Sequence, residues 1–238
     1  AHPAGVRSRL LGLRHRPWPD LSHPALRGLE LWSYPHDWVQ SVLDGRCLDP
    51  FKALRRPVRL LRGPRKSLLA AWDRATRSRR LTAIGAIDCH SRRFDLRDLE
   101  FMSYRHMFQA LRTHLFIDNP ARDDGAVARA LNALAEGRCF IALDELAPST
   151  GARFWAVTAE GRALNMGEEA TFDGPATLRV SLPSPAQIRL IRDGRLVQTW
   201  QNHEAAFVAR QPGVYRFEAS LNGQPWLFAN PFYLRPGP

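Results

Sequence analysis

The sequence predicts an α/β domain followed by an all-β domain, with the change near residue 148. Before that point, short apolar runs typical of strands alternate with amphipathic segments typical of helices, a pattern that indicates parallel βαβ units in an open sheet or a barrel. After it, no helical period is found, and short alternating runs are separated by turn residues, which favours a β-sandwich. The expected domains are therefore residues 1–147 and residues 148–238.

The first part is expected to consist of alternating strands and helices. Ser67 can cap the first of the helices, whose apolar residues Leu68, Leu69 and Trp72 share one face. Gly137 is expected to end the second. The expected strands are 28–34, 81–87, 112–118 and 139–146, and the expected helices are 67–80 and 123–137.

The clearest turn signal of the second part is the stretch Arg192–Arg195, which contains Asp193 and Gly194 between two alternating runs. An Asp-Gly pair tolerates the positive φ angles of a tight hairpin turn. Together with the other turn residues, it divides the last ninety or so residues into six or seven short strands, the number expected for a sandwich.

The chain carries a formal charge of +11, which raises the question of nucleic-acid binding. Its basic residues are nearly all arginine, since Lys52 and Lys66 are the only lysines, a skew that a GC-rich coding sequence produces by itself. The densest basic clusters, 55–66 and 74–80, contain no aromatic residue on which bases would stack. This distribution speaks against nucleic acid as the partner and favours a small anionic substrate.

Cysteine usage and hydropathy place the chain in the cytoplasm. The three cysteines, Cys47, Cys89 and Cys139, are far apart and odd in number, which is typical of a reducing compartment. No apolar run approaches the roughly eighteen residues that a membrane helix needs, so no contact with a membrane is expected.

The most informative chemical signal is the stretch 83–90, in which an apolar strand runs directly into Asp88 and His90. Residues i and i+2 of a strand point to the same face, so the carboxylate and the imidazole are expected to enter one pocket and to bind metal there. The alternative is a surface loop in which Asp88 only caps a turn. His2 precedes Pro3, which favours an extended conformation at a strand end.

Three elements bring a resemblance into view: AHP at 1–3, GLELWS at 28–33 and IGAIDCH at 84–90. In this order they resemble the later part of the polymerase-and-histidinol-phosphatase (PHP) superfamily. The stretches EGRCFIALD, MGEEATF and PWLFANPFYL resemble the C-terminal β domain of its carbaryl-hydrolase-like branch. The resemblance implies a partial, distorted β/α barrel with two or three divalent metal ions at the strand ends, followed by the β-sandwich. It also implies hydrolysis of phosphate or related esters.

Residue by residue, the resemblance implies three metal ligands: His2, Asp88 and His90. Ile87 and Cys89 differ from the residues common in the family, but both are expected to face away from the metal ions. Glu30 is expected to be structural or to support the ligands rather than to bind metal. The mixed nitrogen and oxygen ligands suit Zn, Mn or Fe.

The family's first half supplies further ligands that no residue before His2 provides, so we expect weak metal binding and little turnover from this chain. The sequence thus favours a metal-dependent hydrolase of anionic esters, represented by its C-terminal part. A non-catalytic scaffold or binding module with a degenerate barrel is the alternative. Four further residues are possible contacts for substrate or supports of the ligands, each with an ordinary structural role as the alternative: His36, Arg92, Arg112 and His114.

Overall fold

The computed structural model describes residues 21, 23–45, 55–89, 102–117 and 125–237, and the backbone alone of four short strands. Those strands form two small hairpins: β1 (Arg7–Ser8) with β2 (Leu13–Arg14), and β5 (Arg92–Phe94) with β6 (Leu99–Phe101). The described helices are α1 (Tyr34–Leu43), α3 (Lys66–Ser78), α4 (Tyr104–Ala110) and α5 (Ala126–Glu136), with a 3-10 turn η1 (Pro57–Leu60). No described helix combines the length and the apolar content needed to cross a bilayer.

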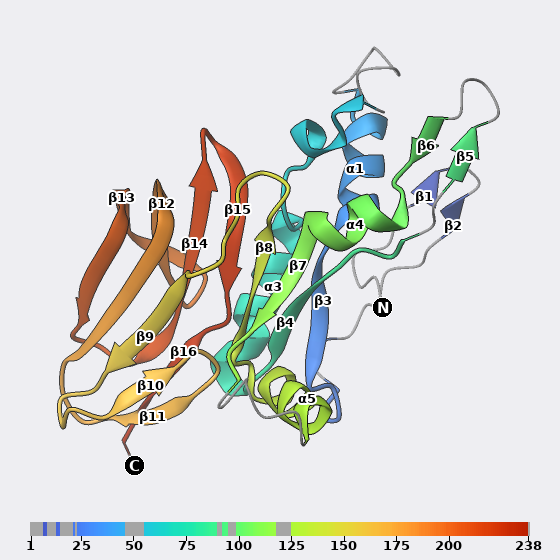
Figure 1. The fold of residues 1–238 in the computed structure, drawn as a ribbon. Coiled ribbons are helices and arrows are strands. Elements are labelled where there is room, and N and C mark those ends of the chain that lie inside the picture. The colour runs from blue at the N-terminus through green and yellow to red at the C-terminus, as the bar shows by residue number, and fades with distance from the viewer. Residues whose placement is uncertain are drawn as a thin grey trace.

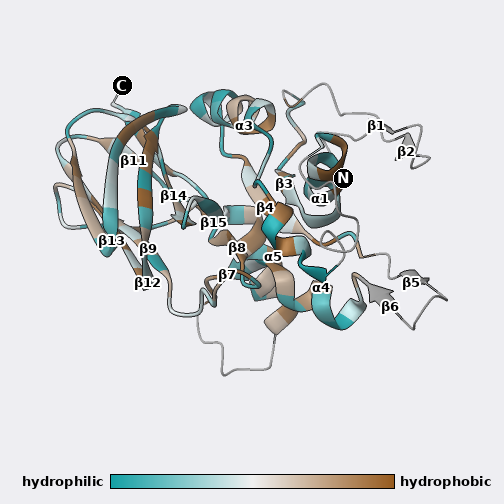
Figure 2. Cartoon of the chain, turned by 90° about the horizontal axis from the view of Figure 1, so that it is seen from above, coloured by the Kyte–Doolittle hydropathy of each residue, from teal (hydrophilic) through white to brown (hydrophobic). Residues whose placement is uncertain are grey.

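Most described strands belong to one ten-stranded sheet, which curls into a half-barrel (Figures 1 and 2). Its main path runs β10-β9-β12-β14-β15-β8-β7, with β13 added beside β12 and β16 joined to β14 and β11. All its pairings are antiparallel except that of β11 with β16. The strands are β7 (Leu111–Leu115), β8 (Cys139–Leu143), β9 (Arg153–Val157), β10 (Ala163–Asn165), β11 (Glu169–Phe172), β12 (Ala176–Arg192), β13 (Arg195–Ala209), β14 (Gly213–Leu221), β15 (Gln224–Ala229) and β16 (Phe232–Pro236).

The predicted α/β fold with a partial β/α barrel is wrong. Strands β3 (Gly28–Ser33) and β4 (Thr82–Ala86) form a parallel pair, and the segment that connects them includes helix α3. Among the described strands, no other parallel pair is connected through a helix. Strands β7 and β8 were expected to continue the parallel series, but they pair antiparallel across α5. Periodicity reports whether a segment is a strand or a helix, and it does not report the direction in which strands pair.

The predicted β-sandwich is also wrong, because the strands join one hydrogen-bonded sheet. Strand β12 is 17 residues long, and its first half pairs with β9 while its second half pairs with β14. Pro183 and Pro185 lie within the shift of register between Ser181 and Ala186, where β12 continues instead of ending. A bulge of this kind increases the local twist, so one long strand turns the sheet where two short strands were expected.

The individual elements were predicted better than their arrangement. Helices α3 and α5 and strands β3, β4, β7 and β8 all form within the expected ranges or one residue outside them. The hairpin at Asp193 and Gly194 is confirmed, with φ angles of 51° and 81° and with Arg192 opposite Arg195. Helix α1 was missed because Pro35 reads as the end of a strand, whereas proline also suits the first turn of a helix.

Two hydrophobic cores share strand β8, whose five residues are all buried. Phe140 and Ala142 pack inside the curled sheet, with Trp226 and Phe217. Ile141 and Leu143 belong to the second core, which lies under α3 and α1. Because side chains alternate along a strand, β8 supplies one face to each core.

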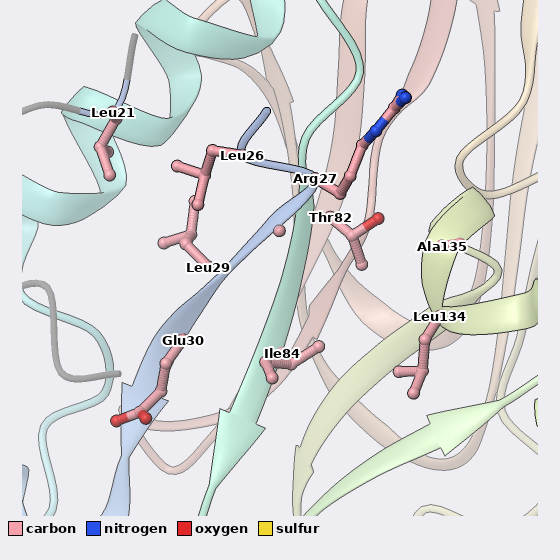
Figure 3. Close-up of a pocket in the computed structure, with 10 residues that line it drawn as sticks. Leu21, Leu26, Arg27, Leu29, Glu30, Thr82, Ile84, Leu134 and Ala135 are labelled. Carbon is pink, nitrogen blue, oxygen red and sulfur yellow. The ribbon is translucent and has the colours of Figure 1, made fainter. Parts of the chain in front are cut away.

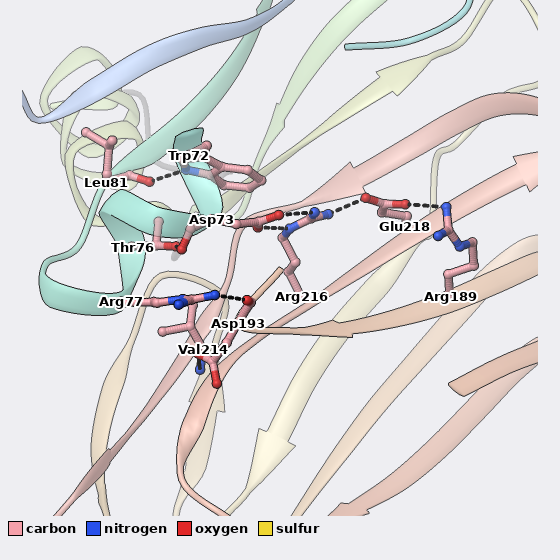
Figure 4. Close-up of polar contacts among 10 residues, drawn as sticks. All are labelled: Trp72, Asp73, Thr76, Arg77, Leu81, Arg189, Asp193, Val214, Arg216 and Glu218. Atoms are coloured by element: carbon pink, nitrogen blue, oxygen red, sulfur yellow. Dashed lines mark hydrogen bonds and ion pairs between the residues drawn. The ribbon is translucent and has the colours of Figure 1, made fainter. Parts of the chain in front are cut away.

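A buried ion-pair chain fastens helix α3 to strand β14 (Figure 4). The Arg216 guanidinium donates to both carboxylate oxygens of Asp73, at 2.8 and 3.0 Å, and also to Glu218, which accepts from Arg189 at 3.1 Å. The Arg216 side chain is 4% exposed, and its guanidinium carbon lies 5.2 Å from the centre of the Trp72 ring. Burial removes water from these charged groups, so the stability of each group in the folded protein depends on its charged partner.

Replacing Asp73 by asparagine keeps the side-chain shape and leaves Arg216 with Glu218, which it shares with Arg189, so that two arginines and one carboxylate carry a net positive charge. We expect Asp73→Asn to lower the free energy of unfolding by about 3 kcal/mol in urea denaturation, because removal of one partner of a buried pair exposes the desolvation cost of the other. Arg189→Gln, at the half-exposed end of the chain, is the control and should cost less than about 1 kcal/mol. Similar small losses in both variants would contradict this account.

Candidate functional site

Strand β4 ends at Ala86, two residues before Asp88. Asp88 itself has φ of 36°, in the left-handed region, so it lies in a turn. The strand alternation that was expected to place Asp88 and His90 on one face therefore ends before Asp88. His90 and His2 lie outside the described residues, and their predicted roles as metal ligands stay predictions.

Side chains, rather than a ladder of backbone hydrogen bonds, hold β4 against the large sheet. The Thr113 hydroxyl of β7 lies 2.9 Å from the Gly85 amide nitrogen and 3.1 Å from the Gly85 carbonyl oxygen. Buried Asn230 accepts from the Ala83 amide at 2.7 Å and donates to the carbonyl oxygens of Ala83 and Cys139, at 3.0 and 2.8 Å. The end of β4 is thereby fixed beside β7 and β8.

A shallow depression of about 450 Å³ lies where β4 ends, next to β7 and helix α4. Asp88 lines it, together with Arg112 and His114 from β7. Phe108 of α4, which is 64% exposed, forms part of its rim. The structure thus brings Asp88 into one depression with two residues that the sequence had marked only as possible contacts.

Asp144, just past β8, holds both basic residues of this depression. Its Oδ2 atom lies 2.8 Å from His114 Nε2 and 3.4 Å from an Arg112 nitrogen, and its Oδ1 accepts from the Ser149 hydroxyl at 2.5 Å. The His114 ring also stacks on Phe140, with centroids 4.7 Å apart. Burial acts to raise the pKa of Asp144, but the hydrogen bonds from His114 and Ser149 outweigh it, so the pKa is lowered and the carboxylate stays ionised.

The contact between Ser149 and His114 does not make a serine nucleophile. The Ser149 hydroxyl lies 3.0 Å from His114 Nε2, the same ring nitrogen that faces Asp144. A relay from serine to aspartate needs a separate ring nitrogen for each partner. The three side chains therefore form an anchor for the imidazole.

Glu145 follows Asp144 and gathers a second polar cluster. It accepts from the Tyr34 hydroxyl at 2.7 Å and lies 3.4 Å from His106 Nε2. The hydrogen bond from His106 to Glu145 raises the pKa of the imidazole against the opposing effect of burial. Burial, followed by the charge of Glu145, raises the pKa of Tyr34.

Asp144, Glu145 and His106 were not predicted from the sequence as functional residues. The expected strand 139–146 included both acidic residues, whereas β8 ends at Leu143 and leaves them at its carboxyl end. A pair of acids directly after a wholly apolar strand was the available signal. Asp88 had been selected by the same rule, which looks for polar residues directly after an apolar strand.

A third acid, the largely buried Asp37, lies just after β3, in the first turn of α1. Its carboxylate accepts from Trp32 Nε1 at 2.9 Å and from the backbone amides of Arg62 and Gly63, at 2.8 and 2.9 Å. Burial nevertheless raises the pKa of Asp37 to about 6, above the ordinary range of an aspartate, despite the three donors and the nearby charge of Arg62. Beside it, His36 contacts the Ser33 hydroxyl at 3.0 Å, a local contact at the start of the helix.

A more apolar pocket of about 500 Å³ lies between β3, β4 and α5 (Figure 3). Leu26, Leu29, Ile84 and Leu134 line it, and Glu30 lies at its edge. It shares no lining residue with the depression beside Asp88. Its lining includes Arg27 but no imidazole, so we place the candidate site at Asp88, where a guanidinium and an imidazole occur together.

Two of the three predicted metal ligands, His2 and His90, lie outside the described residues, so the predicted metal centre stays a prediction. Within the described ranges, no three histidine, cysteine, aspartate or glutamate side chains lie close enough together to hold a metal ion. Asp88 is the one member of the predicted ligand set that they include. The donor set itself, one carboxylate and two imidazoles, fits Zn, Mn or Fe.

Comparison with protein families, with curated proteins and with solved structures found no match to the chain. The resemblance to the PHP superfamily consequently rests on the quoted motifs and stays a prediction.

The pKa of His106 offers a direct test of the Glu145 cluster. Glu145→Gln removes the charge beside the imidazole, and we expect the pKa of His106 to fall, as measured by NMR titration of its ring protons. His203, which is exposed on β13, serves as the internal control, and its ring-proton signals should be the same in both proteins. An unchanged titration of His106 would show that Glu145 does not act on it.

Asp37 should make stability depend on pH in an unusual direction. A carboxyl group whose pKa is about 6 in the folded protein takes up a proton more readily than in the unfolded chain, so stability increases as the pH falls through that value. Between pH 7 and pH 5 we expect this group to add about 1 kcal/mol to the free energy of unfolding.

The measurement is the difference between wild type and Asp37→Asn in urea denaturation at both pH values. The exposed Asp173→Asn is the control, and its difference from wild type should not change with pH. A constant difference for Asp37→Asn as well would contradict the raised pKa.

Proposed function

We propose that the chain forms part of a metal-dependent hydrolase of anionic esters, whose substrate lies in the depression at the end of β4. The observation that carries this proposal is the presence of Asp88, Arg112 and His114 in one depression. A carboxylate at a strand end suits metal binding, and an arginine with an anchored imidazole suits an anionic group. The PHP-like motifs around Asp88 support the same class of reaction.

The residues of the chain would have separate tasks. Asp88, with His2 and His90, would hold divalent ions, Zn, Mn or Fe, which when bound supply a water molecule of lowered pKa. Arg112 would donate hydrogen bonds to the anionic oxygens of the ester. Asp144 would keep Arg112 and His114 in place, since it contacts both and is itself nearly buried.

A non-catalytic binding module is the second candidate, and one observation favours it. Asp144 holds Arg112 and His114 in the depression without any contribution from the predicted metal ligands. In that case the depression would bind an anionic partner through Arg112 and His114 without cleaving it. Metal content and turnover separate the two candidates.

Metal binding should depend on Asp88. After dialysis of the purified chain against Zn²⁺ or Mn²⁺, we expect weak binding and slow hydrolysis of p-nitrophenyl phosphate. Asp88→Ala should weaken metal binding at least about tenfold, because even the loss of a group that only supports a ligand has an effect of that size. Asp173→Ala, which removes an exposed carboxylate elsewhere, is the matched control and should resemble wild type.

Two outcomes would decide against the hydrolase. Unchanged metal affinity and unchanged hydrolysis in Asp88→Ala would remove Asp88 from the site. A wild-type chain that binds p-nitrophenyl phosphate without metal and without turnover would favour the binding module.

A further inference from the structure

A second charged groove, separate from the depression at Asp88, lies between helix α3 and strands β12, β14 and β15. Its volume is about 460 Å³, and it shares no lining residue with the depression at the end of β4. The ion-pair chain of Figure 4 runs along it, because Asp73, Arg216, Glu218 and Arg189 all contribute to its lining.

Two close backbone approaches bound the groove. At Gly194, where φ is 81°, an added Cβ atom would lie 3.1 Å from the Cβ of Asp73, so the β12–β13 hairpin rests directly on α3. At Gly63, where φ is 84°, an added Cβ would lie 3.0 Å from Pro225, so the segment before α3 rests on β15. The groove is lined by residues from both contacts, and these fix its width.

The lining has an excess of positive charge. Its ionisable residues are four cations, Arg62, Lys66, Arg189 and Arg216, and two carboxylates, Asp73 and Glu218, which gives a net charge of +2. Both carboxylates are engaged by Arg216, and Glu218 also by Arg189. The charges of Arg62 and Lys66 therefore meet no further carboxylate in the lining.

The start of α3 adds to this positive field. Lys66 is the first residue of the helix, which runs for 13 residues and has no acidic side chain in its first turn. The amino end of a helix carries partial positive charge, and no acidic residue offsets it here. The charge excess of the groove is thus reinforced at Lys66.

Apolar side chains complete the lining. Leu69 of α3, Ile191 of β12 and Phe228 of β15 all face the groove. A ligand that fits this combination has an anionic head for the basic residues and a short apolar body for the rest.

We propose that the groove binds a small organic anion, with a phosphate or carboxylate head at Lys66 and Arg62 and a short apolar chain along Leu69 and Phe228. Such a ligand contacts both α3 and the large sheet, so its binding stabilises their junction. The site is independent of the proposed hydrolysis, because it uses neither Asp88 nor the residues held by Asp144.

The test uses isothermal titration of the full chain with hexyl phosphate and with inorganic phosphate, at low ionic strength. The titrations are made in the Arg112→Gln background, which weakens anion binding in the depression at β4. We expect hexyl phosphate to bind at least about tenfold more tightly than inorganic phosphate, since burial of several methylene groups contributes to its affinity. Lys66→Gln should weaken hexyl phosphate binding about tenfold, as expected for the loss of a charged hydrogen-bond donor.

Two controls complete the design. Lys66→Arg keeps the charge and should keep most of the affinity, while Arg210→Gln removes an exposed cation outside the groove and should have no effect. Absence of binding, equal affinity for the two phosphates, or equal losses in Lys66→Gln and Arg210→Gln would each overturn the proposal. Binding that is present in wild type and lost in Arg112→Gln alone would assign it to the depression at β4 and would overturn it as well.

Discussion

Strand β8 is buried on both faces, and the arrangement of the molecule depends on that constraint. A strand with two buried faces has to be apolar at every position, and Cys139–Leu143 meets this requirement. One face closes the core of the curled sheet, and the other closes the core under α3. The first polar residues after β8 are Asp144 and Glu145, which lie where both cores end. Asp144 contacts Arg112 and His114 there, and Glu145 contacts His106 and Tyr34. The candidate site is in this sense a consequence of the strand that joins the two cores.

The parallel pair β3–β4 is attached to this frame by a small number of polar side chains. Thr113 and Asn230 bond to backbone groups of β4 that a neighbouring strand would otherwise satisfy. Arg216 and Asp73 fasten the helix that connects β3 with β4. A few buried polar contacts therefore determine where Asp88 lies relative to β7, and a buried polar contact is specific because an unmatched partner is costly.

The sequence was sufficient for elements whose signals are local, and insufficient for contacts between distant segments. The period of α3, the apolar run of β4 and the Asp-Gly turn at 193–194 are all encoded within a few residues, whereas the cap expected at Ser67 is wrong, because α3 already begins at Lys66, after Arg65. By contrast, Arg216 meets Asp73 across 143 positions of the sequence, and no local pattern marks either residue. The same limit explains the wrong fold class, since Pro183 and Pro185 read locally as the end of a strand while the partners of β12 carry it through. At the candidate site, Asp88 was visible because it follows an apolar run, whereas the link from Asp144 to His114 spans 30 positions and depends on the antiparallel pairing of β7 with β8.

The excess of arginine acquires a physical meaning once the partners are known. Arg216 meets carboxylates in a forked geometry, Arg79 donates to the carbonyl oxygens of His23 and Leu26, and Arg235 donates to the carbonyl oxygen of Thr76 and to Glu169. Such links use the several donors of a planar guanidinium, which a lysine does not have. These three arginines thus join segments of the fold. Against this background Lys66 differs in kind: it is one of two lysines, it is exposed at the start of α3, and it lines a groove whose carboxylates are already engaged. A single ammonium cannot make the forked links that these arginines make, so position 66 does not serve as a link of that kind, and its charge stays available to the ligand proposed for the groove.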